Sequence, residues 1–349
     1  MNAARVALDR ADLDYATAIV RAVMPATPAF GWPLLSAAVG SDVVVKHENH
    51  TAVGAFKMRG GLVFVDRLRE RRPDATGLAS ATRGNHGLSL SFAGARAGLR
   101  VTIVVPHGNS SDKNAAMRAL GAEVIEHGHD FQAAREFASS LAQDDPGLEI
   151  VPPFHPDLVL GVATYALELF EQAGELDAVY VPVGMGSGCS ALIAVRDLLG
   201  RRTEIVGVVS ERADATARSF AAGRPVEGES ADTFVDGVAC RVPDPEAIRR
   251  IVGGAARIIT VPEDATADAM RLLFRTTHNV PEPAGALALA GLVADPQRGE
   301  RVAVIQTGGN IDSDMLAEVL AGRTPAPPSA SCGVTSRGGQ PVRRRAAPG

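Results

Sequence analysis

Short apolar runs alternate with segments of helical periodicity along most of the chain, and this alternation restricts the possible folds more than any other sequence feature. The runs expected to form strands cover residues 100–105, 123–126, 178–183, 204–209, 256–261 and 301–305. Helices are expected near residues 10–22, 88–97, 111–120, 130–142, 157–173, 188–199, 263–277, 284–294 and 313–321. The pattern predicts an α/β fold with a mostly parallel sheet, and the unbroken apolar character of the strands indicates helices on both faces.

Two proline-rich segments interrupt this pattern. Pro25, Pro28 and Pro33 predict an extended segment that follows the first helix and leads to Leu35. Residues 145–156 are expected to connect two lobes, because a chain of 349 residues is long enough to build two sheets. We therefore expect two packed units rather than one.

The composition indicates a protein that handles small molecules. A net charge of −5 and a pI of about 5.9 suggest neither a nucleic-acid nor an anionic-membrane partner, and no apolar run approaches the length of a membrane span. Cys189, Cys240 and Cys332 are far apart, which fits a reducing cytoplasm better than disulfides or a metal site. Residues 323–349 contain few large apolar side chains and are expected to form a disordered tail. The expected location is the cytoplasm, with no bound metal.

Lys57 stands at a junction between an expected strand and an expected helix. The apolar residues 43–45 lead into a polar turn, and a helix then begins at the sequence Gly-Ala-Phe-Lys that ends on Lys57. The helix dipole and apolar neighbours both disfavour a charged ammonium, so this lysine is a candidate to form a Schiff base. The alternative interpretation is an ordinary surface lysine in the first turn of a helix.

A second polar loop precedes a helix of small residues. Residues 81–87 read Ala-Thr-Arg-Gly-Asn-His-Gly and follow a β-like run. Small residues allow a ligand to approach the backbone, and N–H groups at the start of a helix bind a carboxylate or a phosphate. An ordinary strand-to-helix turn with a left-handed asparagine is equally compatible with these residues.

A glycine-rich loop follows the expected strand near residue 180. Residues 184–188 read Gly-Met-Gly-Ser-Gly, and their successive N–H groups at a helix start suit a phosphate. The loop also imitates a dinucleotide-binding fingerprint, with Glu211 placed to contact a ribose. However, Cys189 stands where the third glycine of that fingerprint belongs, so a nicotinamide-dependent dehydrogenase is only an alternative.

The last polar loop, residues 306–310, reads Gln-Thr-Gly-Gly-Asn and again lies between a strand and a helix, with Pro281-Glu282-Pro283 some distance before it. Ligands of α/β proteins bind outside the carboxyl ends of the strands, so the four loops are expected to converge on one crevice. A reactive lysine, a phosphate-binding loop, an amide and a hydroxyl together describe a site for pyridoxal phosphate.

These motifs resemble those of the fold type II pyridoxal-phosphate enzymes, the tryptophan synthase β family, and within it the serine/threonine dehydratase and serine racemase branch. The matching residues are 56–60, 84–86, 184–188 and 307–310, in family order, and the resemblance covers roughly residues 20–322. It implies two domains, each a mostly parallel twisted sheet flanked by helices. The implied division gives residues 1–65 and 156–322 to a large cofactor-binding domain and residues 66–155 to a small domain.

The resemblance implies a role for each matching residue. Lys57 would carry the cofactor covalently and act as the base at Cα once the substrate has released it, and Phe56 would pack against the ring. Asn85 would hydrogen-bond the phenolic oxygen of the ring, and Thr307 would face its pyridine nitrogen. The other residues implied to contact the cofactor are Gly184, Met185, Gly186, Ser187 and Gly188 at the phosphate, together with Glu282. Those implied to contact the substrate are Thr82, Arg83, Gly84 and His86.

Arg83 departs from the pattern of the branch. Racemases that this chain resembles carry a serine at this position, which serves as the second acid and base at Cα, whereas an arginine stays protonated and is a poor base. Ordinary threonine dehydratases carry a small residue there. Arg83 either reaches the pocket and binds a larger or acidic substituent of the substrate, or it points to solvent.

Two other departures concern the loops. Met185 and Ser187 replace glycines that are usual in the phosphate loop, and Met185 would be strained if its position required a positive φ. Val209 and Ala215 stand where the branch uses acidic residues to bind a divalent cation, so no tightly bound divalent cation is expected.

The resemblance implies a pyridoxal-phosphate-dependent ammonia-lyase. It would convert a β-hydroxy-α-amino acid, of the threonine or serine type or larger like phenylserine or hydroxyaspartate, to a 2-oxo acid and ammonia by β-elimination. A neutral hydroxyl at Thr307 favours elimination over transamination, because it supports a protonated pyridine poorly. The alternatives are a racemase or a β-replacement enzyme of the same family, the dehydrogenase, and a catalytically silent cofactor-binding module. Enzymes of this type are commonly dimers, so a homodimer is expected.

Overall fold

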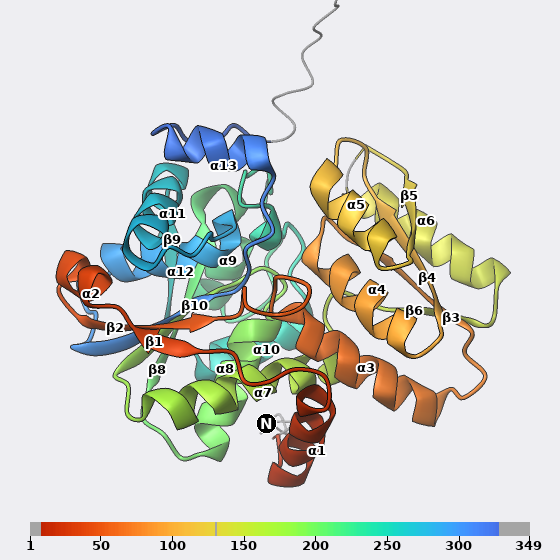
Figure 1. The fold of residues 1–349 in the computed structure, drawn as a ribbon, viewed down its shortest axis with the longest axis horizontal. Coiled ribbons are helices and arrows are strands. Elements are labelled where there is room, and N and C mark those ends of the chain that lie inside the picture. Colours follow the sequence, from red (N-terminus) through yellow and green to blue (C-terminus); the bar gives the residue numbers. More distant parts are fainter. Residues whose placement is uncertain (1–7, 130, 328–349) are drawn as a thin grey trace, which may run out of the picture.

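The computed structural model describes residues 8–129 and 131–327, and these residues form two sheets (Figure 1). The larger sheet has the strand order β1 (Ala29–Gly31), β2 (Asp42–His47), β10 (Arg301–Gln306), β7 (Ala178–Pro182), β8 (Glu204–Ser210) and β9 (Arg257–Val261). The smaller sheet has the order β5 (Glu123–Glu126), β4 (Arg100–Val105), β3 (Gly77–Ala81) and β6 (Leu148–Ile150). Neighbouring strands are parallel except β1 and β2, which confirms the predicted fold class.

Helices surround both sheets. Those beside the larger sheet are α2 (Pro33–Val39), α7 (Pro156–Ala173), α8 (Ser187–Leu198), α9 (Ala215–Ala222), α10 (Pro245–Gly254), α11 (Glu263–Thr277), α12 (Pro283–Ala294) and α13 (Ser313–Leu320). Those beside the smaller sheet are α4 (Asn85–Arg96), α5 (Ser111–Ala119) and α6 (Phe131–Asp144). Near the junction of the two units lie α1 (Arg10–Arg21) and α3 (Lys57–Arg71), and two short 3-10 helices, η1 (Glu211–Ala213) and η2 (Asp236–Val238), follow β8.

The larger sheet is buried on both faces. Val179 of β7 packs into a core formed with α7 and α8, whereas its neighbour Tyr180 packs into a second core formed with α11 and α12. Successive strand residues point to opposite faces, so a strand that is covered on both sides must be apolar throughout. This explains why the apolar runs in the sequence do not alternate with polar residues.

The start of α3 is packed closely against α7. A Cβ added to Gly161 of α7 would lie 2.2 Å from the carbonyl oxygen of Arg59, and one added to Gly60 would lie 2.8 Å from that of Leu158. Glycine at both positions therefore allows the two backbones to meet. This contact fixes the first turn of α3, the turn that begins with Lys57.

A fully buried group of charges lies behind the same turn. Arg59 donates hydrogen bonds from Nε to Glu48 (2.7 Å) and from both terminal nitrogens to Glu168 (2.9 and 2.8 Å), and Lys46 also binds Glu168 (2.8 Å). These four residues, here called the Arg59 cluster, come from β2, its following turn, α3 and α7. Buried charges are tolerated when they are paired and hydrogen-bonded, and both conditions are met here.

The structure differs from the sequence expectations in three segments. Residues 33–39 form α2 instead of continuing an extended segment, because Pro33 stands in the first helical turn, where its missing N–H has no intrahelical role. The interval between β8 and β9 contains α9 and α10, which were not predicted. Residues 145–156, expected only as a connection, also contribute β6.

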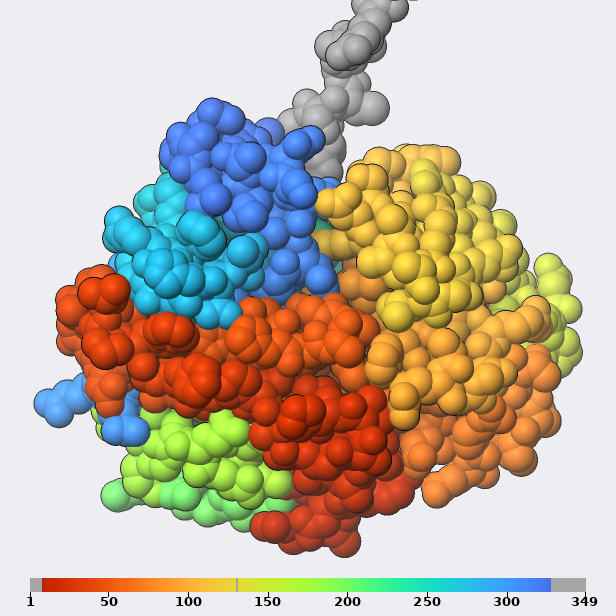
Figure 2. All heavy atoms as spheres, in the orientation of Figure 1, coloured from red at the N-terminus to blue at the C-terminus, as the bar shows by residue number. Residues whose placement is uncertain are grey.

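The two units meet near η2 and the start of α13. In Figure 2 the orange-to-yellow segment forms one side of the molecule, and the blue C-terminal segment lies beside it. Ser110 donates a hydrogen bond to Asp312 across this boundary. The domain limits proposed from the sequence remain a prediction, and residues 328–349 of the expected tail lie outside the described residues. Within the described part of the chain, no helix is both long and apolar enough to cross a bilayer.

Candidate functional site

The segment that carries Lys57 is attached by its backbone to the carboxyl end of β10. The N–H of Phe56 donates to the carbonyl of Thr307 (3.0 Å), and the N–H of Gly309 donates to the carbonyl of Gly54 (2.9 Å). Gly54 has a φ of +69°, a conformation that side chains other than glycine rarely adopt. The last polar loop of the sequence therefore holds the lysine loop in place, as the expected convergence of strand ends requires.

Lys57 lies in an environment that weakens its charge. Its side chain is half-buried at the wall of a cavity. Burial lowers the pKa of its amine to about 8, and the nearby carboxylate of Glu282 opposes this shift. The Nζ atom lies 5.2 Å from the centre of the Phe56 ring. A lowered pKa leaves a larger neutral fraction of the amine near neutral pH, and the neutral amine is the nucleophile.

The chain contains only three lysines, and the other two are paired. Lys46 binds Glu168 (2.8 Å), and Lys113 binds Asp236 (2.5 Å). Within residues 8–129 and 131–327, Lys57 makes no ion pair. It is therefore the one lysine whose amine is available for chemistry.

The loop after β3 presents the start of α4 to the cavity. The hydroxyl of Thr82 accepts hydrogen bonds from the N–H groups of Gly84 (2.9 Å) and Gly87 (3.4 Å), so it serves as a local cap. Among the described residues, no acceptor meets the N–H groups of Asn85 and His86, the first two of α4. These two donors are the ones left to bind a carboxylate.

Asn85 connects three of the predicted loops. Its Nδ2 donates to both carboxylate oxygens of Glu282 (2.7 and 2.9 Å), and its Oδ1 accepts from Nδ2 of Asn310 (2.8 Å). Glu282 is fully buried, and burial raises the pKa of its carboxyl to about 7. The Nδ2 group proposed from the sequence to meet the phenolic oxygen of the cofactor is thus shared with a buried carboxylate.

His86 is a buried histidine that lines the same cavity. Its Nε2 has no hydrogen-bond partner among the described residues, and burial, followed by the charge of Lys57, lowers its pKa to about 3. The ring is therefore neutral at pH 7, and its buried Nε2 is free to accept or donate a hydrogen bond.

The glycine-rich loop adopts an unstrained conformation. Gly186 takes the left-handed conformation (φ +92°). Apart from glycines, His278 is the only residue in the described part of the chain with a positive φ, so Met185 does not have one and is not strained. A Cβ on Gly184 would lie 2.8 Å from the carbonyl oxygen of Gly237, which requires glycine there. Ser187 and Gly188 begin the 12-residue helix α8. The loop therefore offers N–H groups at the start of a long helix.

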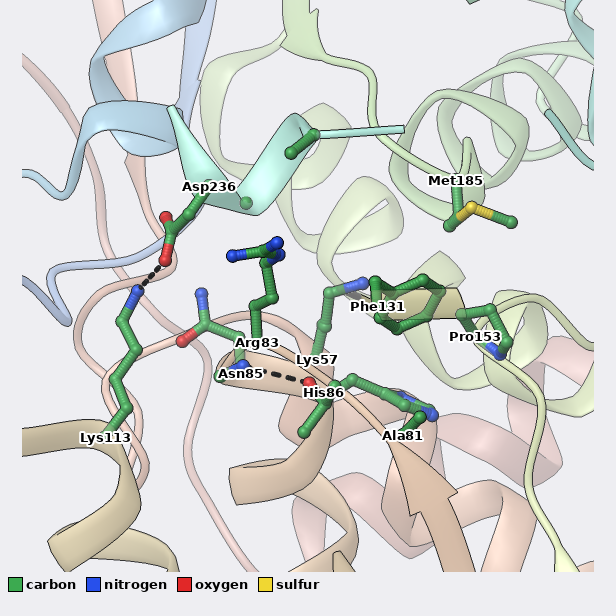
Figure 3. Close-up of a pocket in the computed structure, with 14 residues that line it drawn as sticks. Lys57, Ala81, Arg83, Asn85, His86, Lys113, Phe131, Pro153, Met185 and Asp236 are labelled. Carbon is green, nitrogen blue, oxygen red and sulfur yellow. Dashed lines mark hydrogen bonds and ion pairs between the residues drawn. The ribbon is translucent and has the colours of Figure 1, made fainter. Parts of the chain in front are cut away.

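One cavity of about 100 Å³ brings several of the predicted residues together (Figure 3). Those that line it are Lys57, Thr82, Arg83, Gly84, Asn85, His86 and Met185. Those that do not are Phe56, Gly184, Gly186, Ser187, Gly188, Glu282 and Thr307. Two of these lie just behind the lining, because Glu282 binds Asn85 and Gly184 contacts Gly237 of the wall, while Phe56 directly precedes Lys57 and binds Thr307 through its backbone.

The cavity also contains residues that the sequence did not suggest. Lys113 of α5 and Asp236 of η2 form an ion pair across the boundary between the two units, and Phe131 and Pro153 complete the wall. Lys113 and Asp236 are 123 residues apart, so no local pattern could have revealed their pairing. Only the tertiary arrangement brings them to the site.

Comparison with known proteins agrees with this geometry. The family model described as "Pyridoxal-phosphate dependent enzyme" matches residues 21–308. Biosynthetic L-threonine dehydratase of Escherichia coli is 35% identical over 308 residues, which cover 86% of this chain and 60% of that protein. L-threo-3-hydroxyaspartate ammonia-lyase of a Pseudomonas species is 31% identical over 299 residues, covering 85% and 93%. The solved structure of maize serine racemase matches with a TM-score of 0.83 at 25% identity, covering 90% and 98%. The chain thus spans 60% of the length of the dehydratase.

Proposed function

The chain belongs to the family of pyridoxal-phosphate-dependent enzymes of fold type II, and on this premise we propose that it is an ammonia-lyase that acts on β-hydroxy-α-amino acids. The observation that carries the proposal is a lysine with a lowered pKa beside the start of α4 in one cavity. The names of the matched dehydratase and hydroxyaspartate ammonia-lyase support the reaction class.

The residues at the site fit pyridoxal phosphate. Lys57 offers an amine for the aldehyde, and the ring of Phe56 beside it is apolar. The close approach of Gly184 to Gly237 and the left-handed Gly186 shape a loop whose N–H groups suit a phosphate. We propose that this loop holds the phosphate and that Asn85, Glu282 and Thr307 lie near the ring. When bound, the cofactor supplies an electron sink for a deprotonated Cα.

The roles of the chain's own groups follow from their positions. The free N–H groups at the start of α4 bind the substrate carboxylate and orient Cα toward Lys57. Lys57, with a pKa of about 8, removes the Cα proton at neutral to slightly alkaline pH. The β-hydroxyl takes up a proton and leaves as water, which balances the proton removed from Cα, and the released enamine tautomerises and hydrolyses to a 2-oxo acid and ammonia.

Racemisation is the second candidate, because maize serine racemase shares the fold. A racemase needs a second acid and base on the opposite side of Cα from Lys57. The residue at the position expected for it is Arg83, which stays protonated and cannot accept a proton at working pH. This favours elimination.

We also propose that the protein is a homodimer in the cytoplasm. Light scattering of a homodimer would give twice the chain mass of 36.2 kDa.

The proposal predicts that the holoenzyme releases 2-oxo acid and ammonia from at least one β-hydroxy-α-amino acid. Lys57→Ala should remove the visible absorbance of the bound cofactor and lower turnover by a factor on the order of 1,000 or more, because the base at Cα is lost. Arg96→Ala, at the far end of α4, is the matched control and should retain both. If none of threonine, serine, 3-hydroxyaspartate and phenylserine released a 2-oxo acid, the lyase hypothesis would be refuted. Chiral analysis of the remaining substrate would then test the racemase hypothesis.

A further inference from the structure

Among the described residues, Arg83 and Lys57 are the two charged side chains of the cavity that make no ion pair, and Lys57 is the one that the cofactor would occupy. Arg83 is half-buried, and within residues 8–129 and 131–327 its guanidinium makes no hydrogen bond or ion pair. A guanidinium carries five N–H donors, and leaving them unpaired away from bulk water is costly. In Figure 3 the side chain of Arg83 extends toward η2, and the side chain of Lys57 lies beside it.

Arg83 also lies at the boundary between this cavity and a second one. The second cavity has a volume of about 360 Å³ and lies between the start of α5, η2 and the loop before α13. Three residues, Arg83, Lys113 and Asp236, line both cavities. A substituent on Cβ that is longer than the methyl group of threonine and points toward Arg83 would therefore approach this boundary.

Among the charged residues that line the first cavity, the cations outnumber the carboxylates. Lys113 neutralises Asp236 at 2.5 Å, and Asp312 on the wall of the second cavity accepts a hydrogen bond from Ser110. The remaining charges that face the first cavity are the cations Lys57 and Arg83, while His86 is neutral. Lys57 is occupied when the cofactor is bound, which leaves the charge of Arg83 without a counterion.

We propose that Arg83 is a specificity-determining residue that binds a carboxylate on the side chain of the substrate, so that the preferred substrate is a dicarboxylic β-hydroxy-α-amino acid. This inference rests on the proposed function. The α-carboxylate is held by the N–H groups at the start of α4, and the second carboxylate meets the guanidinium at the boundary between the cavities. A planar carboxylate can accept two parallel hydrogen bonds from a guanidinium, which gives it an advantage over a neutral substituent.

The test compares threo-3-hydroxyaspartate with threonine in the wild-type holoenzyme and in Arg83→Gln. We expect the wild type to prefer hydroxyaspartate in kcat/KM. We expect Arg83→Gln to lower this preference by about 10- to 100-fold, because a charge-assisted bidentate contact is lost. Arg83→Lys should retain part of the preference. Arg96→Gln, at the far end of α4 and away from the cavity, should leave the preference unchanged.

Binding provides a readout that does not depend on turnover. Succinate should bind to the wild-type holoenzyme more tightly than butyrate in calorimetry, and Arg83→Gln should remove the difference. Equal loss of kcat/KM for both substrates in Arg83→Gln would mean that Arg83 acts on the shared α-carboxylate. A preference of the wild type for phenylserine would mean that the site accepts an aromatic substituent. Either result overturns the inference. If no substrate releases 2-oxo acid, the proposed function itself fails.

Discussion

Two cations on α3, two residues apart, occupy opposite environments. Arg59 lies in the Arg59 cluster, where Glu48 and Glu168 satisfy its nitrogens, whereas Lys57 faces a cavity and has no ion pair among the described residues. The cluster raises the pKa of the Arg59 guanidinium above its usual value, while burial lowers that of the Lys57 amine to about 8. The same helix turn is therefore anchored on one side and reactive on the other.

The difference shows that burial of a cation can either anchor a helix or leave an amine reactive. Burial penalises a charge in both places, and the outcome depends on whether acidic partners compensate for the lost water. At Arg59 two carboxylates do so, and the result is a fixed joint between β2, α3 and α7. At Lys57 the only acidic group that opposes the shift is Glu282, whose own carboxyl has a pKa raised to about 7 by burial.

The largest effect is expected from removing the anchoring cation. Arg59→Met should lower the free energy of unfolding of the cofactor-free protein by about 3–5 kcal/mol, because Glu48 would remain buried without its cation and Glu168 would keep only Lys46 and Arg21. Denaturant unfolding monitored by circular dichroism would measure this. Arg10→Met, which removes an exposed ion pair with Asp14 on α1, is the control and should cost less than about 1 kcal/mol.

The matched substitution at the reactive position sharpens the contrast. Lys57→Met removes a buried charge that has no ion pair, so it should leave the stability of the cofactor-free protein unchanged or raise it. The cofactor must be absent from all samples, because its binding would stabilise every variant except this one. If Lys57→Met destabilises as much as Arg59→Met, the two environments do not differ as described.

A smaller effect is expected from changing the neighbour of the reactive cation. Glu282→Gln removes the charge that raises the pKa of Lys57, so that pKa should fall below about 8, by on the order of one pH unit. Acetylation of the cofactor-free protein by acetic anhydride, followed by peptide mass spectrometry, measures it, since the rate at Lys57 rises with pH as the neutral amine forms. An upward shift, or none, would show that Glu282 does not act on Lys57 through its charge.

Much of the fold was predictable because buried parallel strands leave a strong local signal. The strands 100–105 and 123–126 were predicted with the observed limits, and so was the helix 263–277. The signal is weaker where helices are short and begin with proline, as in α2 and α10. Pro33 was predicted to interrupt structure and α10 was not predicted at all, although Pro33 and Pro245 both stand in the first turn of a helix, which tolerates them.

For the site, the sequence predicted which loops meet but not which side chains within them pair. The placement of Lys57, Asn85 and Arg83 around one cavity follows from the rule that strand ends converge, but the partners of these residues do not. The pairing of Lys113 with Asp236 and the bond between Asn85 and Glu282 join segments more than 100 residues apart. Nothing in the sequence around Arg83 indicated that it lacks a partner.

The hydrogen bond from Phe56 to Thr307 has a consequence for the synthesis of the protein. β2, which leads to Lys57, is separated from β7 by β10, and β10 leaves the ribosome about 250 residues after Lys57. Until β10 inserts between them, the loop before α3 lacks its two backbone hydrogen bonds to Thr307 and Gly309, although the contact between α3 and α7 can already form. The lysine loop of the growing chain therefore gains its last backbone support only after residues 301–309 have been synthesised.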